Sequence, residues 1–201
     1  MACVHSRDEE RSYDATVIQP ADQPDLFSSL EPDRGPSHEE GGEGHPMAKL
    51  VAATDGSCLR NPGPGGWCWY VDDDCWGAGG EPDTTNNRME LLAVAALLES
   101  VPAGRPVHIM ADSSYVIDAL TKWRHGWKKK NWRTSSGEPV KNRDLMERLD
   151  VLMGTHAPTF EWVRGHQGHA ENEAADDRAR AVATAIQAGR DDWDPGPGLT
   201  C

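Results

Sequence analysis

The order of short apolar segments and helical segments between residues 49 and 188 constrains the fold of this chain more than any other feature. Apolar runs bounded by Gly, Pro, Asn and Asp are typical of strands, whereas helix formers with apolar side chains three and four residues apart are typical of helices. We therefore expect strands at residues 50–54, 67–71, 75–78, 107–111 and 159–163, and helices at residues 88–100, 113–120, 142–153 and 170–188. The order β-β-β-α-β-α-α-β-α predicts an α/β domain with helices packed on a mixed sheet.

The two ends of the chain differ in composition from its middle. Residues 1–46 are rich in Pro, Gly, Ser, Asp and Glu and poor in large apolar residues, which predicts a disordered acidic extension. Residues 189–201 (GRDDWDPGPGLTC) predict a flexible tail. One folded domain is then expected at residues 47–188. Met47 opens a segment that would serve as a protein start, so we expect residues 1–46 to be either a dispensable arm or a misassigned start, with a self-masking acidic arm as the alternative.

The formal net charge of the chain is −13, which by itself argues against a nucleic-acid partner because a polyanion attracts Lys and Arg. Much of the negative charge lies in residues 1–46, however, whereas residues 122–143 are locally basic. The average charge therefore does not exclude a nucleic-acid substrate for the folded domain.

The five cysteines are odd in number, and none of them forms a C-x-x-C pair. This predicts free thiols in a reducing cytoplasm rather than a disulfide framework or a zinc site. The longest apolar run, residues 91–98, is too short to span a bilayer, and the N-terminus lacks an apolar signal-peptide core. No pattern signals oligomerisation, so we expect a cytoplasmic monomer that does not contact membranes.

Three acidic residues stand where two expected strands end and where a helix begins. Asp55 follows the first strand, Asp112 follows the fourth, and Glu90 lies in the first turn of the longest apolar helix. Sites in α/β proteins gather at the carboxyl ends of strands, and Mg²⁺ takes carboxylate, water and phosphate oxygens as ligands. Taken singly, each acid also has an ordinary explanation as a turn residue, a cap or a partner of the helix dipole. The spacing alone indicates only a candidate metal-dependent site.

Four longer motifs surround these acids. They are TDGSCLRNPGPGGW (residues 54–67), TTNNRMELLA (84–93), ADSSYV (111–116) and WVRGHQGHAENEAAD (162–176). In this order they closely resemble bacterial ribonuclease H of type 1, over about residues 49–188. The resemblance implies a ribonuclease H-like fold, in which a five-stranded mixed sheet, three antiparallel strands followed by two parallel ones, is flanked by helices.

The resemblance also implies catalytic residues. The family's four metal-binding carboxylates fall on Asp55, Glu90, Asp112 and Asp176, all of which are acidic here. Its mobile histidine falls on His166, and a histidine titrates near neutrality, which suits proton transfer to a leaving oxygen or help in product release. The alternative for His166 is an ordinary surface-loop histidine. The implied cofactor is Mg²⁺, two ions with substrate, with Mn²⁺ as a substitute.

Residues that match the family's contacts with its substrate lie in the same motifs. Three asparagines match positions at the minor groove of the hybrid, where the 2′-hydroxyl distinguishes RNA from DNA, and their alternative is turn chemistry. They are Asn61, Asn86 and Asn87. Thr85 and Asn142 match a pocket that holds a phosphate of the DNA strand. Arg88 is as readily explained by a structural ion pair.

Residues 122–143 resemble the basic protrusion with which the family grips the DNA strand. Eight basic side chains face one acid, Glu138, with three tryptophans among them. Local positive charge with aromatic surfaces suits a sugar–phosphate backbone, although a solvated helix face with tryptophans in the core is the alternative. We expect a mixture of the two, with contacts to nucleic acid from Trp123, Trp127, Lys128, Lys129 and Lys130.

These observations predict an endonuclease that hydrolyses the RNA strand of RNA·DNA hybrids by two-metal-ion catalysis. The resemblance implies 5′-phosphate and 3′-hydroxyl ends, a role in removing primers and hybrids, and no obligate protein partner. One alternative is a non-catalytic hybrid-binding module, against which the four acids and His166 argue. The other is a different nuclease on the same fold, against which the asparagine-bearing motifs and the basic segment argue.

Overall fold

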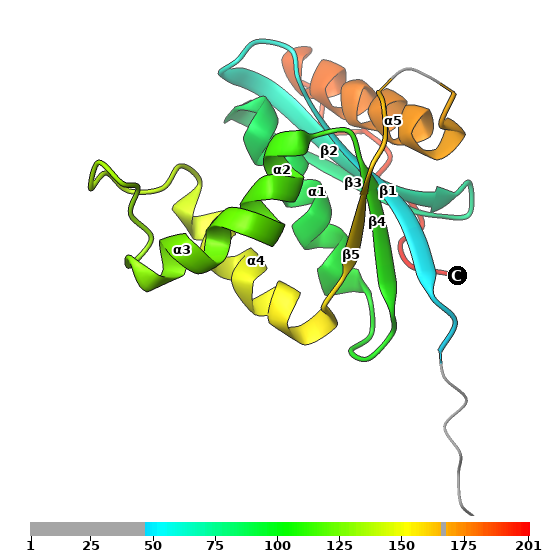
Figure 1. Ribbon diagram of the computed structural model, residues 1–201. Helices are drawn as coiled ribbons and strands as arrows, with labels where there is room; N and C mark the ends of the chain where they lie inside the picture. The colour runs from blue at the N-terminus through cyan, green and yellow to red at the C-terminus, as the bar shows by residue number, and fades with distance from the viewer. Residues whose placement is uncertain (1–46, 166–167) are drawn as a thin grey trace, which may run out of the picture. The chain divides into compact units, whose positions relative to one another are not determined.

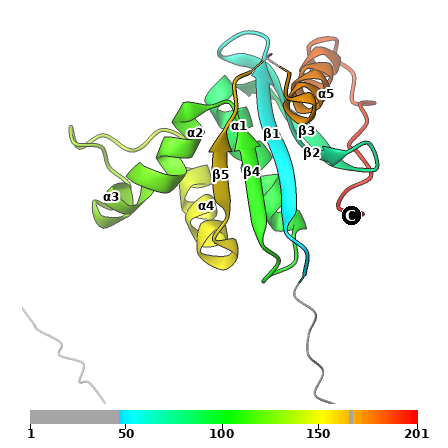
Figure 2. The same ribbon diagram turned by 45° about the vertical axis from the view of Figure 1, so that its right-hand side comes forward.

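Five strands form one mixed sheet in the order β3-β2-β1-β4-β5 (Figures 1 and 2). The structure is a computed structural model that describes residues 47–165 and 168–201. The strands are β1 (Leu50–Cys58), β2 (Gly63–Asp72), β3 (Cys75–Thr84), β4 (Val107–Ala111) and β5 (Thr159–Trp162). β1, β2 and β3 pair antiparallel, and β4 pairs parallel with both β1 and β5. The predicted five-stranded mixed sheet is confirmed.

Helices cover both faces of this sheet (Figure 1). They are α1 (Asn86–Ser100), α2 (Ser114–Asp118), the π-helical turn η1 (Ala119–Trp123), α3 (Arg124–Lys129), α4 (Arg143–His156) and α5 (Ala170–Gln187). α1 and α4 pack on one face around the larger apolar core, while α5 packs on the other face against β1, β2 and β3. The basic segment at residues 122–143, for which no helix was predicted before residue 142, thus contains the end of η1 and all of α3.

The central helix α1 is buried as its composition predicts. Seven of its apolar side chains are fully or almost fully buried: Met89, Leu91, Ala93, Val94, Ala95, Leu97 and Leu98. A helix that is apolar almost all round needs a neighbour on every side, and α1 finds them in the sheet and in α4. Its beginning is therefore held firmly beside the sheet, which matters for Glu90.

The expectation that Asp55 ends the first strand is wrong. β1 continues to Cys58, and Asp55 lies opposite Cys68 within the β1–β2 ladder. The NPGPGG run (residues 61–66) lies between the strands predicted at residues 50–54 and 67–71, but its glycines are strand residues of β2. A Cβ at Gly66 would lie 2.2 Å from the carbonyl oxygen of Ala179 in α5, so this glycine permits close packing of helix on sheet.

Residues after α5 lie against β3 instead of forming the expected flexible tail. The amide of Ala78 donates to the carbonyl of Pro195 (2.9 Å), and the amide of Gly198 donates to that of Trp76 (3.0 Å). Cys75 and Cys201 form a disulfide, which corrects the prediction of free thiols for these two residues. Cys58 and Cys68 are free, as expected. The disulfide partners are 126 residues apart in sequence, so only tertiary structure brings them together.

Among the helices that the structure describes, none combines the length and apolarity that a membrane crossing requires. The predicted extension at residues 1–46 lies outside the described residues, and its disorder stays a prediction. Residues 47–165 and 168–201 belong to one compact unit.

Candidate active site

The four predicted carboxylates come from four different elements around the middle of the sheet. Asp55 lies within β1, Asp112 directly follows β4, Glu90 lies near the beginning of α1, and Asp176 lies in α5. β1 and β4 are parallel neighbours, with Ala53 opposite Met110, so Asp55 and Asp112 lie at the same level of adjacent strands. The negative charges of the other three acids all act on Asp55. The structure therefore brings together the four acids that the sequence analysis singled out.

A glycine beside Asp55 allows Glu90 to approach. A Cβ at Gly56 would lie 2.2 Å from the backbone nitrogen of Glu90 and 2.5 Å from the carbonyl carbon of Met89. No side chain fits in that space, because backbone atoms cannot move aside as the end of a flexible side chain can. The close contact of β1 with α1 at this point places Glu90 next to the Asp55 strand.

A second glycine lies against Asp112. A Cβ at Gly165 would lie 2.4 Å from the Oδ2 atom of Asp112, so the chain that follows β5 passes directly beside this carboxylate. Two hydrogen bonds hold the strand ends in place. The indole Nε1 of Trp162 donates to the backbone carbonyl of Asp112 (2.9 Å), and the amide of Val163 donates to that of Ala111 (3.1 Å).

The environment of Asp55 and Glu90 opposes the ionisation of these two carboxyl groups. Burial, then the charge of Asp112 and those of Asp176 and Glu90, raise the pKa of Asp55 from 3.8 to about 8, while a backbone hydrogen bond from Gly56 acts in the other direction. Burial and the charge of Asp112 also raise the pKa of Glu90 to about 7, while the polar side chains of Ser113 and Asn86 act in the other direction. Carboxyl groups with raised pKa values in one place mark a candidate functional site.

Positive charge reaches this group mainly through α5. Nη2 of Arg180 lies 2.7 Å from Oδ2 of Asp176, one helical turn away on the same helix. Asn86 donates to Oε1 of Glu90 (2.6 Å), whereas Oε2 of Glu90 is buried and has no hydrogen-bond partner among the described residues. A buried carboxylate oxygen without a donor is costly, and a cation is the simplest group that would satisfy it.

The donor set fits a hard divalent cation. Mg²⁺ takes carboxylate oxygens together with several waters and substrate phosphates rather than a closed protein cage. In residues 47–165 and 168–201, no group of three or more His, Cys, Asp or Glu side chains could by itself hold a metal ion, so the fit rests on the chemistry of the acids and not on a preformed set of ligands. The excess of buried negative charge around Asp55 and the unsatisfied Glu90 oxygen are what a bound cation would compensate.

The predicted proton-transfer residue, His166, lies outside the described residues, so its role stays a prediction. Gly165, the residue directly before it, lies against the Asp112 carboxylate. The chain on the N-terminal side of His166 is thus placed at the acidic group.

A polar pocket of about 500 Å³ lies where α1 and α4 begin. Its lining residues are Asn61, Thr85, Asn87, Lys141 and Asn142. Four of these five are predicted substrate contacts, and the pocket brings them together although they come from three separate parts of the chain. The remaining predicted asparagine, Asn86, does not line the pocket and instead binds Glu90.

The basic segment divides into structural and exposed parts, as its mixed pattern predicted. Arg124 and Lys128 both bind the buried Asp150, each at 2.6 Å, so Lys128 is engaged in an ion pair. Trp132 is buried in the core. The predicted contacts at the surface are Trp123, Lys128, Lys129 and Lys130. Trp127 is half-buried, and its ring centroid lies 5.6 Å from that of Trp123.

Sequence reasoning missed several residues that shape these sites. Gly56 and Gly165 matter because a Cβ at either position would clash with residues distant in sequence, and no local sequence pattern reveals such a clash. Arg180 could have been found from its position four residues after Asp176 on a helix. Lys141 was grouped with the basic segment, although its position next to Asn142 was a signal that it belongs to the pocket.

Comparison with known proteins gives consistent matches. The model of the RNase H family matches residues 47–184. The chain is 46% identical over 153 residues to "Ribonuclease H" of Tropheryma whipplei (strain Twist), a match that covers 76% of this chain and 94% of that protein. It is 49% identical over 144 residues to "Ribonuclease H" of Rhodospirillum rubrum, covering 69% and 86%.

Solved structures show the same likeness. The crystal structure of LC9-RNase H1, described as a type 1 RNase H with the type 2 active-site motif, superposes with a TM-score of 0.60 at 29% identity and covers 78% of each chain. The RNase H domain of rv2228c from Mycobacterium tuberculosis, solved as a fusion protein, has a TM-score of 0.53 at 21% identity and supports the fold alone. It covers 70% of this chain and 97% of that one.

Proposed function

The chain belongs to the RNase H family, and on this premise we propose that it hydrolyses the RNA strand of RNA·DNA hybrids in a Mg²⁺-dependent reaction. Its relatives make it a ribonuclease H, hence a nuclease and a hydrolase. The observation that carries the finer proposal is the gathering of four acids around Asp55, among which the ionisation of Asp55 and Glu90 is unfavourable without a cation. A protein that needs only to bind a hybrid has no use for that arrangement.

The residues that would hold the metal are Asp55, Glu90, Asp112 and Asp176. Bound there, two Mg²⁺ ions would supply an activated water and stabilise charge on the departing 3′-oxygen. Asn86 would orient Glu90 through its 2.6 Å hydrogen bond, and Arg180 would hold Asp176 in a defined rotamer until metal binds. We assign to His166 the transfer of a proton to the leaving oxygen. Products would carry 5′-phosphate and 3′-hydroxyl ends.

Substrate choice is assigned to two surfaces near the acidic group. The polar pocket would take a phosphate of the DNA strand on Thr85 and Asn142, while the minor groove with its 2′-hydroxyls would lie against the asparagines. The exposed part of the basic segment, with Trp123, Lys129 and Lys130, would contact the backbone of the DNA strand.

Further expectations accompany this proposal. We expect the protein to act as a cytoplasmic monomer in removing primers and hybrids, with Mn²⁺ able to replace Mg²⁺. We also assign catalysis to residues 47–188 and expect no contribution to it from residues 1–46.

The experiment that tests the function is cleavage of a hybrid labelled on its RNA strand, with matched RNA·RNA and DNA·DNA duplexes beside it. Asp55→Asn and Asp176→Asn remove predicted metal ligands. Asp177→Asn is the matched control, because Asp177 is the next residue of α5 and is exposed.

We expect Mg²⁺-dependent cleavage of RNA in the hybrid only, lost in the first two variants and retained in the control. Binding of the hybrid by the wild type without cleavage would refute the enzyme and favour a binding module. Cleavage of all three duplexes would refute the assigned substrate.

A further inference from the structure

The polar pocket is built from the beginnings of two helices. Thr85 is the N-cap of α1 and Asn142 is the N-cap of α4, and neither side chain makes a capping hydrogen bond to its own helix. The amide of Asn86 instead donates to Oδ1 of Asn61 (3.3 Å). The Thr85 hydroxyl and the Asn142 amide, which both line the pocket, are thus left for a ligand at the beginnings of two helices.

One residue at this place works against an anion. Asp144 lies in the first turn of α4, only two residues from Asn142, and its side chain is 63% exposed. A carboxylate so close to the pocket would repel a phosphate unless its charge is compensated.

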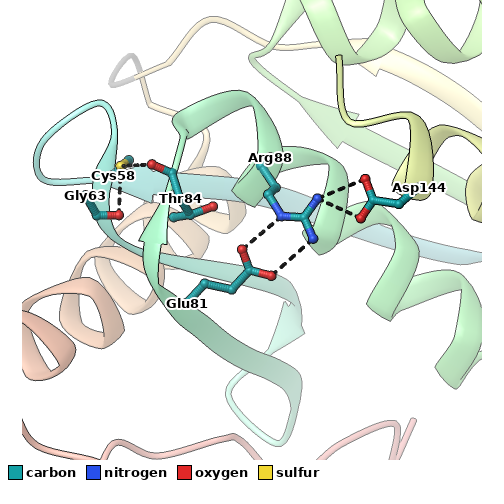
Figure 3. A network of polar contacts seen from close by, with 6 residues as sticks. All are labelled: Cys58, Gly63, Glu81, Thr84, Arg88 and Asp144. Atoms are coloured by element: carbon teal, nitrogen blue, oxygen red, sulfur yellow. Dashed lines mark hydrogen bonds and ion pairs between the residues drawn. The ribbon is translucent and has the colours of Figure 1, made fainter. Parts of the chain in front are cut away.

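Arg88 of α1 compensates that charge. Its Nη1 lies 3.1 and 2.9 Å from the two carboxylate oxygens of Asp144, while Nε and Nη2 bind Glu81 of β3 at 2.9 and 3.4 Å. Figure 3 shows the guanidinium between the two carboxylates, with one acid from the sheet and the other from α4. Arg88 therefore ties together β3 and the beginnings of both helices that form the pocket.

We propose that Arg88 is a positioning residue, which holds the beginnings of α1 and α4 at the separation that a backbone phosphate of the substrate requires and offsets part of the charge of Asp144 beside it. The inference rests on the proposed function, because it concerns the same substrate. Arginine suits this role better than lysine, since its planar fork binds two carboxylates at once. Its side chain is only 26% exposed, which further restricts its motion.

A second ion pair offers a matched control. Arg148 of α4 binds Glu99 near the end of α1, so it links the same two helices. Like Arg88 and Asp144, neither residue lines the pocket, but Arg148 and Glu99 lie farther along their helices from Asn142 and Thr85. If both ion pairs only link α1 to α4, replacing either arginine should change substrate binding equally. If Arg88 positions the pocket, only its replacement should weaken substrate binding.

The test measures binding of a fluorescent RNA·DNA hybrid in EDTA by anisotropy, together with KM and kcat in Mg²⁺. We expect Arg88→Gln to raise the hybrid Kd and KM about tenfold, with kcat within about twofold of wild type. Arg88→Lys should give Kd and KM values between those of the wild type and those of Arg88→Gln. Adding Asp144→Asn to Arg88→Gln should restore part of the affinity, because the uncompensated charge is then gone. Arg148→Gln should leave Kd and KM within about twofold of wild type.

A double-mutant cycle with Asn142→Ala separates positioning from general loss of charge. If Arg88 acts through the pocket, Asn142→Ala costs about tenfold in the wild type and under about threefold in Arg88→Gln. Additive effects, or equal effects of Arg88→Gln and Arg148→Gln, would overturn the inference. If the wild type neither binds nor cuts the hybrid, the proposed function itself fails, and this outcome is distinct from a wild type that cuts while Arg88 is without effect.

Discussion

Replacing Asp55 by asparagine should stabilise the metal-free protein while abolishing cleavage. Asp55 is 7% exposed, and its pKa is raised from 3.8 to about 8, first by burial and then by Asp112. Each pKa unit corresponds to about 1.4 kcal/mol, so the buried carboxylate lowers the free energy of unfolding by at most roughly 5–6 kcal/mol above pH 8. The titrations of neighbouring acids are coupled to that of Asp55, so only part of this destabilisation belongs to Asp55 alone. We therefore expect Asp55→Asn to raise the free energy of unfolding by about 2 kcal/mol.

The sign of the pH dependence follows from the direction of the shift. The folded state holds the Asp55 proton up to about pH 8, whereas the unfolded chain loses it near pH 3.8. The folded state thus binds more protons in this window, and wild-type stability should fall as pH rises from about 4 to about 8. The asparagine variant should show a smaller fall, so the gap between the two proteins should widen with pH.

The assay is urea unfolding in EDTA at several pH values between 5 and 8.5, repeated with millimolar Mg²⁺. Asp83→Asn, an exposed position of β3, is the control. Mg²⁺ should stabilise the wild type more than Asp55→Asn, because only the folded wild type retains the full set of acids. Equal stability of the wild type and Asp55→Asn at pH 8 in EDTA would refute the argument from buried charge.

Four other predictions concern separate parts of the chain. Gly56→Ala should cost about 3 kcal/mol of stability and most of the activity, because its methyl group would strike the backbone at Glu90; urea unfolding with wild-type values would contradict this. Cys201→Ser should lower the unfolding free energy by about 2–4 kcal/mol without reductant, and dithiothreitol should remove the difference. His166→Ala should lower kcat about 100-fold with little change in hybrid Kd, measured by single-turnover cleavage. A chain that begins at Met47 should retain full kcat and KM, and loss of activity would show that residues 1–46 contribute.

Local sequence patterns predicted most of the strands and helices, because burial and backbone preference depend on residues close together in the chain. The burial of α1 follows from its apolar composition, and β4 was predicted at residues 107–111 with no error at either end. The extent of β1 and β2 was not predictable in the same way. In a sequence, glycines within strands resemble turn residues. Gly66 is needed because any side chain there would clash with the carbonyl oxygen of Ala179, which is more than a hundred residues away.

The candidate site shows the same division. Four acids in four motifs were identifiable because the motifs carry a specific resemblance, and the structure brings these acids together. The raised pKa values of Asp55 and Glu90 depend on burial and on neighbouring charges, neither of which a linear pattern contains. The contact of Gly165 with Asp112 belongs to the same class of property.

The sequence by itself determined the order of strands and helices, the family resemblance and the identity of the acids, because each of these depends on residues close together in the chain. Only the tertiary structure decided that the tail joins β3 through Cys75 and Cys201, and that Arg88 links Glu81 to Asp144 across three elements. These contacts join residues distant in sequence, and short-range forces act between them only after the chain has folded.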